Sequence, residues 1–184
     1  MKIRSTEELV RLYRERADLP YGLTDVTQLQ HALQGAHLAR SEGHRPELVV
    51  ATLFHDVGHL LGRLNDNPAE RGIDDRHEIS GGRILAALFG DEIAQPTRLH
   101  VAAKRYLCAT EADYFGRLSP DSVRSLELQG GPMSDAECAA FRAEPGWEDA
   151  LLVRRWDDRA KDPHANVPGL DAYLPDIAAC ARAA

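Results

Sequence analysis

The hydrophobic and polar positions of this chain show no alternating stretch typical of strands, whereas signals that begin and end helices recur throughout. At Ser5, Thr27 and Ser134 a hydroxyl residue stands three positions before Glu or Gln, the arrangement of a capping box. Prolines suited to a first helical turn and paired glycines mark further ends. Helices are expected over residues 5–17, from 27 on, over 46–61, 75–89 and 96–110, from 120 to the glycines at 130–131, from 134 on, and over 147–159 and 170–183.

This pattern predicts an all-α helical bundle, with polar surface loops at residues 62–74 and 161–169. The 184 residues are enough for one domain with a substantial core and too few for two, so residues 1–184 are expected to form a single domain. No internal repeat or low-complexity tract interrupts them.

Composition narrows the class of partner. The net charge of −7 argues against a sequence-independent nucleic-acid binder, and no apolar run approaches the ~20 residues of a membrane span. The charged first residues do not resemble a signal peptide, so a cytoplasmic location is expected. The three cysteines form no C-x-x-C pair, which disfavours a disulfide framework or zinc knuckle. A small molecule is the expected partner.

Candidate metal chemistry centres on His55 and Asp56, which end an apolar run that begins at Val49. A buried imidazole beside a buried carboxylate costs several kcal/mol unless both are paired, and a divalent cation satisfies both. Other predicted helices carry four more residues of ligand type, namely His31, His77, His100 and Asp157. Six ligands are enough for two metal ions.

Adjacent helical residues point roughly 100° apart, so His55 and Asp56 are expected to face two ions rather than one. With Asp56 bridging, His31, His55 and Asp157 would complete one site, and His77 and His100 the other, at a metal spacing of ~3.5–4 Å. Imidazole and carboxylate without thiolate favour iron, manganese or zinc, and open coordination positions would suit iron.

Cationic residues share helix faces with these ligands. His59 follows His55 by four residues, and Lys104, Lys161 and Arg154 lie three or four residues from His100 or Asp157. Their mutual repulsion in an acidic protein is explained by an anion between them, such as a phosphate or phosphonate, with Ser122 as an added hydroxyl donor. The alternatives are solvated lysines and a structural ion pair of Arg154 with Asp157 or Asp158.

The six-residue ligand order resembles that of the HD-domain superfamily over almost the entire chain. Members with four ligands are phosphohydrolases, whereas His77 and His100 resemble the additional ligands of a two-metal branch that contains phosphodiesterases and oxygenases. Within that branch, several segments resemble the mixed-valent di-iron oxygenases that cleave the carbon–phosphorus bond of 1-hydroxyalkylphosphonates, a group related to myo-inositol oxygenase. These segments are residues 21–22 with 28–31, 74–78, 100–108, 129–133 and 155–161.

The resemblance implies an Fe(II)/Fe(III) pair, with an organophosphonate and O2 as substrates and a 2-oxoglutarate-dependent hydroxylase as the pathway partner that installs the 1-hydroxyl. One iron would be held by His31, His55, Asp56 and Asp157, and the other by Asp56, His77 and His100. The phosphonate would contact His59, Lys104, Ser122, Arg154 and Lys161. Tyr21 corresponds to a tyrosine that covers one iron and swings away when substrate binds; its alternative is an ordinary aromatic in a turn.

At one position the chain differs from the family pattern in a way that bears on the substrate. The family's aminophosphonate enzyme has a glutamate three residues after the tyrosine, where this chain has Thr24 and then Asp25. A primary ammonium is therefore disfavoured. Tyr21 with Asp25 could serve a quaternary ammonium, which favours conversion of (R)-1-hydroxy-2-(trimethylammonio)ethylphosphonate to glycine betaine. Hydroxymethylphosphonate, which has no amine, would need no carboxylate there.

Two other functions fit part of the pattern. A metal-dependent phosphohydrolase would use the same ions and cations on a phosphoester, and independence from O2 would distinguish it. A catalytically silent metal-binding or regulatory domain is less favoured, because the ligand set is complete.

Overall fold

The computed structural model describes residues 3–22, 24–62 and 72–182, and across these residues the protein is helical, with no strand. The predicted all-α fold is confirmed. The helices are α1 (Thr6–Arg16), α2 (Gln28–Ser41), α3 (Pro46–Phe54), α4 (His77–Leu88), α5 (Asp91–Thr110), α6 (Pro120–Leu128), α7 (Asp135–Arg142), α8 (Trp147–Arg159) and α9 (Leu174–Cys180). Short 3-10 segments add η1 (Val57–Leu61), η3 (Phe115–Arg117) and η4 (Leu170–Tyr173).

Helix starts follow the capping signals. Thr27 and Ser134 each form a full capping box, and the Ser5 side chain accepts a hydrogen bond from the backbone N–H of Glu8. α8 begins and ends at the predicted residues, Trp147 and Arg159.

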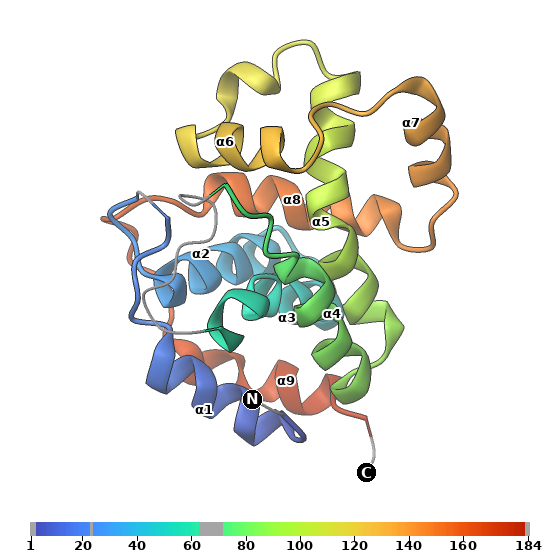
Figure 1. The fold of residues 1–184 in the computed structure, drawn as a ribbon. Helices are drawn as coiled ribbons and strands as arrows, with labels where there is room; N and C mark the ends of the chain where they lie inside the picture. The colour runs from blue at the N-terminus through green and yellow to red at the C-terminus, as the bar shows by residue number, and fades with distance from the viewer. Residues whose placement is uncertain (1–2, 23, 63–71, 183–184) are drawn as a thin grey trace.

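Helices α2 and α3 lie at the centre of the bundle, with α8 across one side and α1 and α9 on the other (Figure 1). The long helix α5 packs against α3, α4 and α8 and extends toward α6 and α7. The main core joins α1, α3, α8 and the C-terminal segment through Tyr13, Phe54, Trp156 and Tyr173. A smaller cluster, with Ala103, Phe141 and Ala150 as its buried members, links α5, α7 and α8.

The helix predicted from Pro46 through Leu61 is wrong in its second half, because α3 ends at Phe54 and the chain turns at Asp56 into η1. The close approach of η1 to the start of α4 explains the turn. A Cβ on Gly58 would lie 2.1 Å from the backbone oxygen of His77, so only glycine allows this contact. The break brings Asp56 against α4.

Two other boundaries differ from the prediction. α5 begins at Asp91 rather than Pro96, because Gly90, with φ +98°, ends the preceding turn and the acidic Asp91 and Glu92 occupy the first turn of the helix. The C-terminal helix predicted over residues 170–183 starts as η4 and ends at Cys180.

The second predicted loop, residues 161–169, is irregular and mostly exposed, as expected. Most of the first, residues 62–74, lies outside the described residues. Among the helices that the structure describes, none combines the length and hydropathy needed to cross a bilayer.

Candidate metal centre and anion pocket

The structure brings the six predicted metal ligands together in the core, although they come from separate elements. His31 lies on α2, His55 and Asp56 follow α3, His77 begins α4, His100 lies on α5 and Asp157 on α8, and all six are buried. They form two groups whose donor atoms lie within 4.8 Å of one another in each group.

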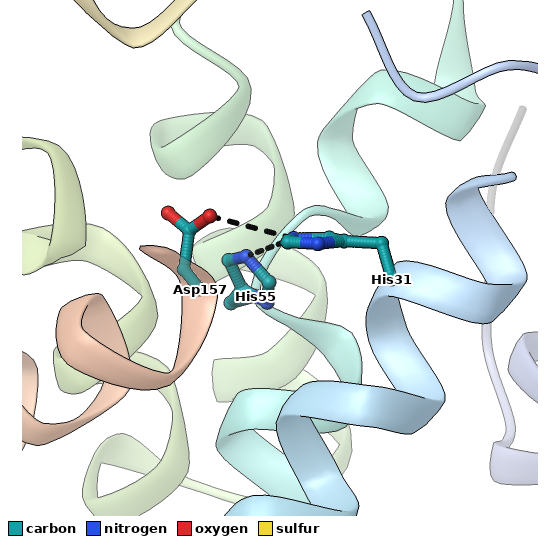
Figure 2. A group of neighbouring side chains, drawn as sticks. All are labelled: His31, His55 and Asp157. Carbon is teal, nitrogen blue, oxygen red and sulfur yellow. Dashed lines mark hydrogen bonds and ion pairs between the residues drawn. The ribbon is translucent and has the colours of Figure 1, made fainter. Parts of the chain in front are cut away.

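The first group contains His31, His55 and Asp157, which converge from α2, the end of α3 and α8 (Figure 2). The Nε2 atom of His31 lies 3.3 Å from Nε2 of His55 and 3.5 Å from Oδ1 of Asp157. One imidazole thus faces both a second imidazole and a carboxylate, an arrangement that fits a divalent cation.

The second group contains Asp56, His77 and His100. Oδ1 of Asp56 lies 3.5 Å from Nε2 of His77 and 3.6 Å from Nε2 of His100. Its other oxygen, Oδ2, lies 3.4 Å from Nε2 of His55 and 3.6 Å from Nε2 of His31. The Asp56 carboxylate therefore stands between the two groups with one oxygen toward each, which is the geometry of a bridging ligand.

The hydrogen bonds behind the histidines test whether these residues suit metal ions. Each of the four uses Nδ1 to donate to an oxygen, which leaves the lone pair on Nε2 pointing into the centre. The acceptors of His31, His55 and His100 are the backbone oxygens of Ala160 (2.9 Å), Thr52 (2.7 Å) and Thr97 (2.7 Å).

As a result, two pairs of Nε2 lone pairs face each other, at 3.3 Å between His31 and His55 and 3.2 Å between His77 and His100. Neither nitrogen of a pair has a hydrogen to donate to the other. A cation at each position turns this repulsion into coordination, so the donor set fits two metal ions.

The charge states agree with this geometry. Burial lowers the pKa of His31 to about 4 and holds that of His100 well below its ordinary value, so both rings are neutral at pH 7. Burial alone would raise the pKa of Asp157, but Arg154 and Lys161 hold it well below its usual range. His31 and His100 are therefore neutral imidazoles and Asp157 is an ionised carboxylate, the forms that bind metals.

Tyr21 reaches the first group. Its hydroxyl donates to Oδ1 of Asp157 at 3.1 Å, and its ring stacks on His31 with a centroid distance of 3.7 Å and an interplanar angle of 12°. The Thr24 hydroxyl donates to the Tyr21 backbone oxygen at 2.5 Å and so braces this turn. Asp25 is exposed. Of these three predicted substrate contacts, Tyr21 is the one whose side chain contacts the centre.

Lys104 is buried beside the centre, with only 2% of its surface exposed. Its Nζ donates to Oγ of Ser125 at 2.6 Å. Burial, reinforced by the charge of Arg154, lowers the pKa of the Lys104 amine to about 7. A lysine this deeply buried is not the solvated residue of the alternative interpretation.

Arg154 is also buried, and it contacts both acidic residues that follow it on α8. Nη1 lies 2.7 Å from Oδ2 of Asp157, and Nη2 pairs with Asp158 and lies 3.4 Å from Oγ of Ser122. Nε donates to the hydroxyl of Tyr114 at 3.1 Å. The structural ion pair considered from the sequence is therefore present.

The remaining predicted cations, Lys161 and His59, lie close to the carboxylates of the same centre. Lys161 Nζ lies 3.7 Å from Oδ1 of Asp157 and 3.9 Å from Oδ1 of Asp158. His59 Nε2 lies 4.0 Å from Oδ1 of Asp56. Arg154, Lys161 and His59 thus lie within about 4 Å of a carboxylate of the centre, and Lys104 is buried nearby.

Comparison with known proteins identifies the family. The model of the HD domain matches residues 29–138, which include five of the six candidate ligands. The chain belongs to the HD-domain family. The match leaves out α8 and α9, although Asp157 on α8 completes the first ligand group.

Two curated relatives of this HD-domain protein carry names of enzymes. Hydroxymethylphosphonate dioxygenase of Gimesia maris is 47% identical over 156 residues, which cover 84% of this chain and 78% of the relative. The glycine-betaine-forming [1-hydroxy-2-(trimethylamino)ethyl]phosphonate dioxygenase of Leisingera caerulea is 38% identical over 166 residues, 90% of this chain and 85% of the relative. The uncharacterized protein L432 of Acanthamoeba polyphaga mimivirus is 30% identical over 173 residues, 93% and 79% of the two chains. The resemblance to HD-domain phosphonate oxygenases is confirmed.

Sequence reasoning missed several polar residues around this HD-domain centre. Asp158 was considered only as an ion-pair partner of Arg154, four residues before it, and not as part of the site. Asp75 and Ser125 had local signals, since Asp75 lies two residues before His77 and Ser125 three residues after Ser122 on α6. Tyr114 had none, because only the fold brings it to Arg154.

Proposed function

We propose that this HD-domain protein cleaves the carbon–phosphorus bond of a 1-hydroxyalkylphosphonate with O2, releasing phosphate and a carboxylate. One observation carries the proposal: the Asp56 carboxylate directs one oxygen toward each of two groups of metal-ligand type, and the buried cations Lys104 and Arg154 lie beside them. The names of the two phosphonate dioxygenases among the relatives support the same reaction class.

In this proposal His31, His55 and Asp157 would hold one iron ion and His77 and His100 would hold the other, with Asp56 available to both. The donor set of nitrogen and oxygen without sulfur suits iron. Bound there as an Fe(II)/Fe(III) pair, iron would supply the redox chemistry that couples reduction of O2 to oxidation of the carbon bearing the hydroxyl.

The chain's own side chains bind and orient the phosphonate. Lys104, Arg154 and Lys161 supply positive charge, and Ser122 and His59 add hydrogen-bonding groups beside them. Fixed cations stabilise both the bound dianion and the departing phosphate, since negative charge stays on that group throughout the reaction. Lys104 is the catalytic cation of the set because it is the most deeply buried lysine near the centre.

Tyr21 covers the first ligand group through its hydrogen bond to Asp157 and its stacking on His31. A substrate that approaches this group displaces the Tyr21 ring. Tyr21 is therefore assigned both a gating role and a contact with the substrate's substituent.

The turn that contains Tyr21 also bears on which substituent the substrate carries. The sequence favoured the trimethylammonio compound because Tyr21 and Asp25 could serve a quaternary ammonium, yet the Asp25 side chain is exposed. We therefore place hydroxymethylphosphonate first, since it needs no contact of this kind. The trimethylammonio compound is second, supported by the aromatic face of Tyr21.

The test uses protein reduced and loaded with iron without oxygen, then given limited O2 and one of three 1-hydroxyphosphonates: unsubstituted, trimethylammonio or amino. Equal molar O2 uptake and phosphate release on one substrate is the expected result. His77→Ala should retain the fold and lose O2 uptake, because the second ligand group is incomplete. Phosphate release from phosphoesters without O2 uptake would instead establish a phosphohydrolase.

A further inference from the structure

Asp75, which the function proposed above does not use, holds two histidines at the edge of the centre. Its Oδ1 accepts a hydrogen bond from Nδ1 of His77 at 2.9 Å, and its Oδ2 accepts one from Nδ1 of His59 at 2.8 Å. Oδ1 also accepts from the backbone N–H of His77 at 3.3 Å. The three contacts fix the Asp75 carboxylate, whose side chain is 25% exposed.

The two histidines also contact each other. Their rings stack with a centroid distance of 3.9 Å and an interplanar angle of 24°. On the inner side, Nε2 of His77 lies 3.5 Å from Oδ1 of Asp56, and Nε2 of His59 lies 4.0 Å from the same oxygen. Asp75, the two rings and Asp56 therefore form a closed set of contacts, so a displacement of one ring changes the contacts of the other.

His77 differs from the other candidate ligands in what lies behind it. His31, His55 and His100 donate to backbone oxygens, whereas His77 donates to a side-chain carboxylate. A carboxylate behind a ligating histidine fixes the ring and its tautomer and raises the basicity of the metal-binding nitrogen. Here the same carboxylate also fixes His59, a candidate phosphonate contact.

We propose that Asp75 is a positioning residue that couples occupation of the metal position at His77 to binding of the phosphonate group at His59. This inference rests on the proposed function for the role of His59. Because both rings share one anchor, a metal ion that draws His77 into place also sets the ring of His59 for the anion. The reverse holds by linkage, so a bound anion strengthens metal binding at this position.

The experiment compares Asp75→Asn and Asp75→Ala with the parent protein and with Asp74→Asn, which makes the same charge change at the preceding, exposed residue. Fe(II) binding is measured by equilibrium dialysis without oxygen, and binding of inorganic phosphate by calorimetry at saturating iron. Thermal unfolding of each variant checks the fold. None of these readouts requires turnover.

Asp75→Ala should weaken binding of the second iron by roughly 10- to 100-fold, as for other residues that orient metal ligands. It should also weaken phosphate binding when iron is saturating. Asp75→Asn should fall between, since its amide has one acceptor oxygen and can hold one imidazole. Asp74→Asn should match the parent in both measurements.

A double variant separates shared anchoring from a general disturbance. If Asp75 acts on the anion through His59, Asp75→Ala should weaken phosphate binding no further in a His59→Ala background. Additive effects would overturn the proposal, as would a change in iron binding alone or parent-like binding of both. If the iron and phosphate results hold while no phosphonate gives O2-dependent phosphate release, the proposed function fails and the coupling stands.

Discussion

Lys104 shows how the fold changes the chemistry of a single residue. Its amine is buried beside Arg154, and these surroundings lower its pKa from 10.5 to about 7. The residue therefore changes charge in the physiological range. An anion bound beside it favours the ammonium form, so binding at higher pH is accompanied by uptake of a proton.

The expected pH dependence has a definite sign. The ammonium of Lys104 is the form that attracts a phosphonate, and it is lost in the free protein as pH rises through about 7. Phosphonate affinity should therefore fall by up to about tenfold per pH unit between pH 8 and 9. Calorimetry in buffers of different ionisation enthalpy would detect the linked proton.

Lys104→Met is the matched control, since it keeps an unbranched side chain of nearly the same length and removes the charge. It should bind phosphonate more weakly than the parent, with iron content unchanged and the proton uptake lost. If phosphonate affinity in Lys104→Met depended on pH as it does in the parent, the proton taken up on binding would belong to another group.

Residue type and helix spacing were enough to predict the membership of both ligand groups and most of the cations around them. They did not identify Tyr114, which reaches the site by a tertiary contact that leaves no local spacing. Asp75 had a local signal, because it lies two residues before His77, but its contact with His59 depends on the fold. They also placed Asp25 beside Tyr21 on sequence proximity alone, and in the structure its side chain is exposed.

Among the elements, the break between α3 and η1 determines the site. Helix starts at Thr27 and Ser134 were predictable because capping is local. The break after Phe54 was not, because it depends on the approach of η1 to α4 through Gly58, a contact between segments separated in the sequence. Local helix signals through Leu61 are overridden there by packing.

Gly58→Ala tests this contact. The new Cβ would lie 2.1 Å from the backbone oxygen of His77, so η1 and α4 must separate. The expected loss is about 1–3 kcal/mol of unfolding free energy, together with weaker iron binding at His77. Denaturant unfolding and iron content measure the two effects.

Gly62→Ala is the comparison, because a Cβ there meets nothing within 4 Å. It should change neither stability nor iron content appreciably. If the two variants had the same stability and iron content, the approach of η1 to α4 would not be what requires glycine at position 58.

For the whole molecule, the ligand groups join distant parts of the chain. Side chains as far apart in the sequence as His31 and Asp157 meet at one centre. Helices α1 and α9 lie outside the region matched to the HD domain, yet they contribute Tyr13 and Ile177 to the main core. We propose on this basis that residues 1–184 form a single domain.

Iron should therefore stabilise the entire fold. Occupation of one site at a free concentration 100 times its dissociation constant adds about 2.7 kcal/mol to the unfolding free energy. For a chain of this size, the gain corresponds to a rise of roughly 5–10 °C in Tm. Thermal unfolding without oxygen, with iron and then with excess chelator, measures it; an unchanged Tm would contradict iron binding by the folded state.

The pairing of α4 with α5 bears on how such a centre could evolve. His77 and His100 stand on these two helices, which pack against each other, whereas His31, His55 and Asp157 stand elsewhere. A lineage could therefore gain or lose the second metal position through substitutions on one helical hairpin, leaving the first intact.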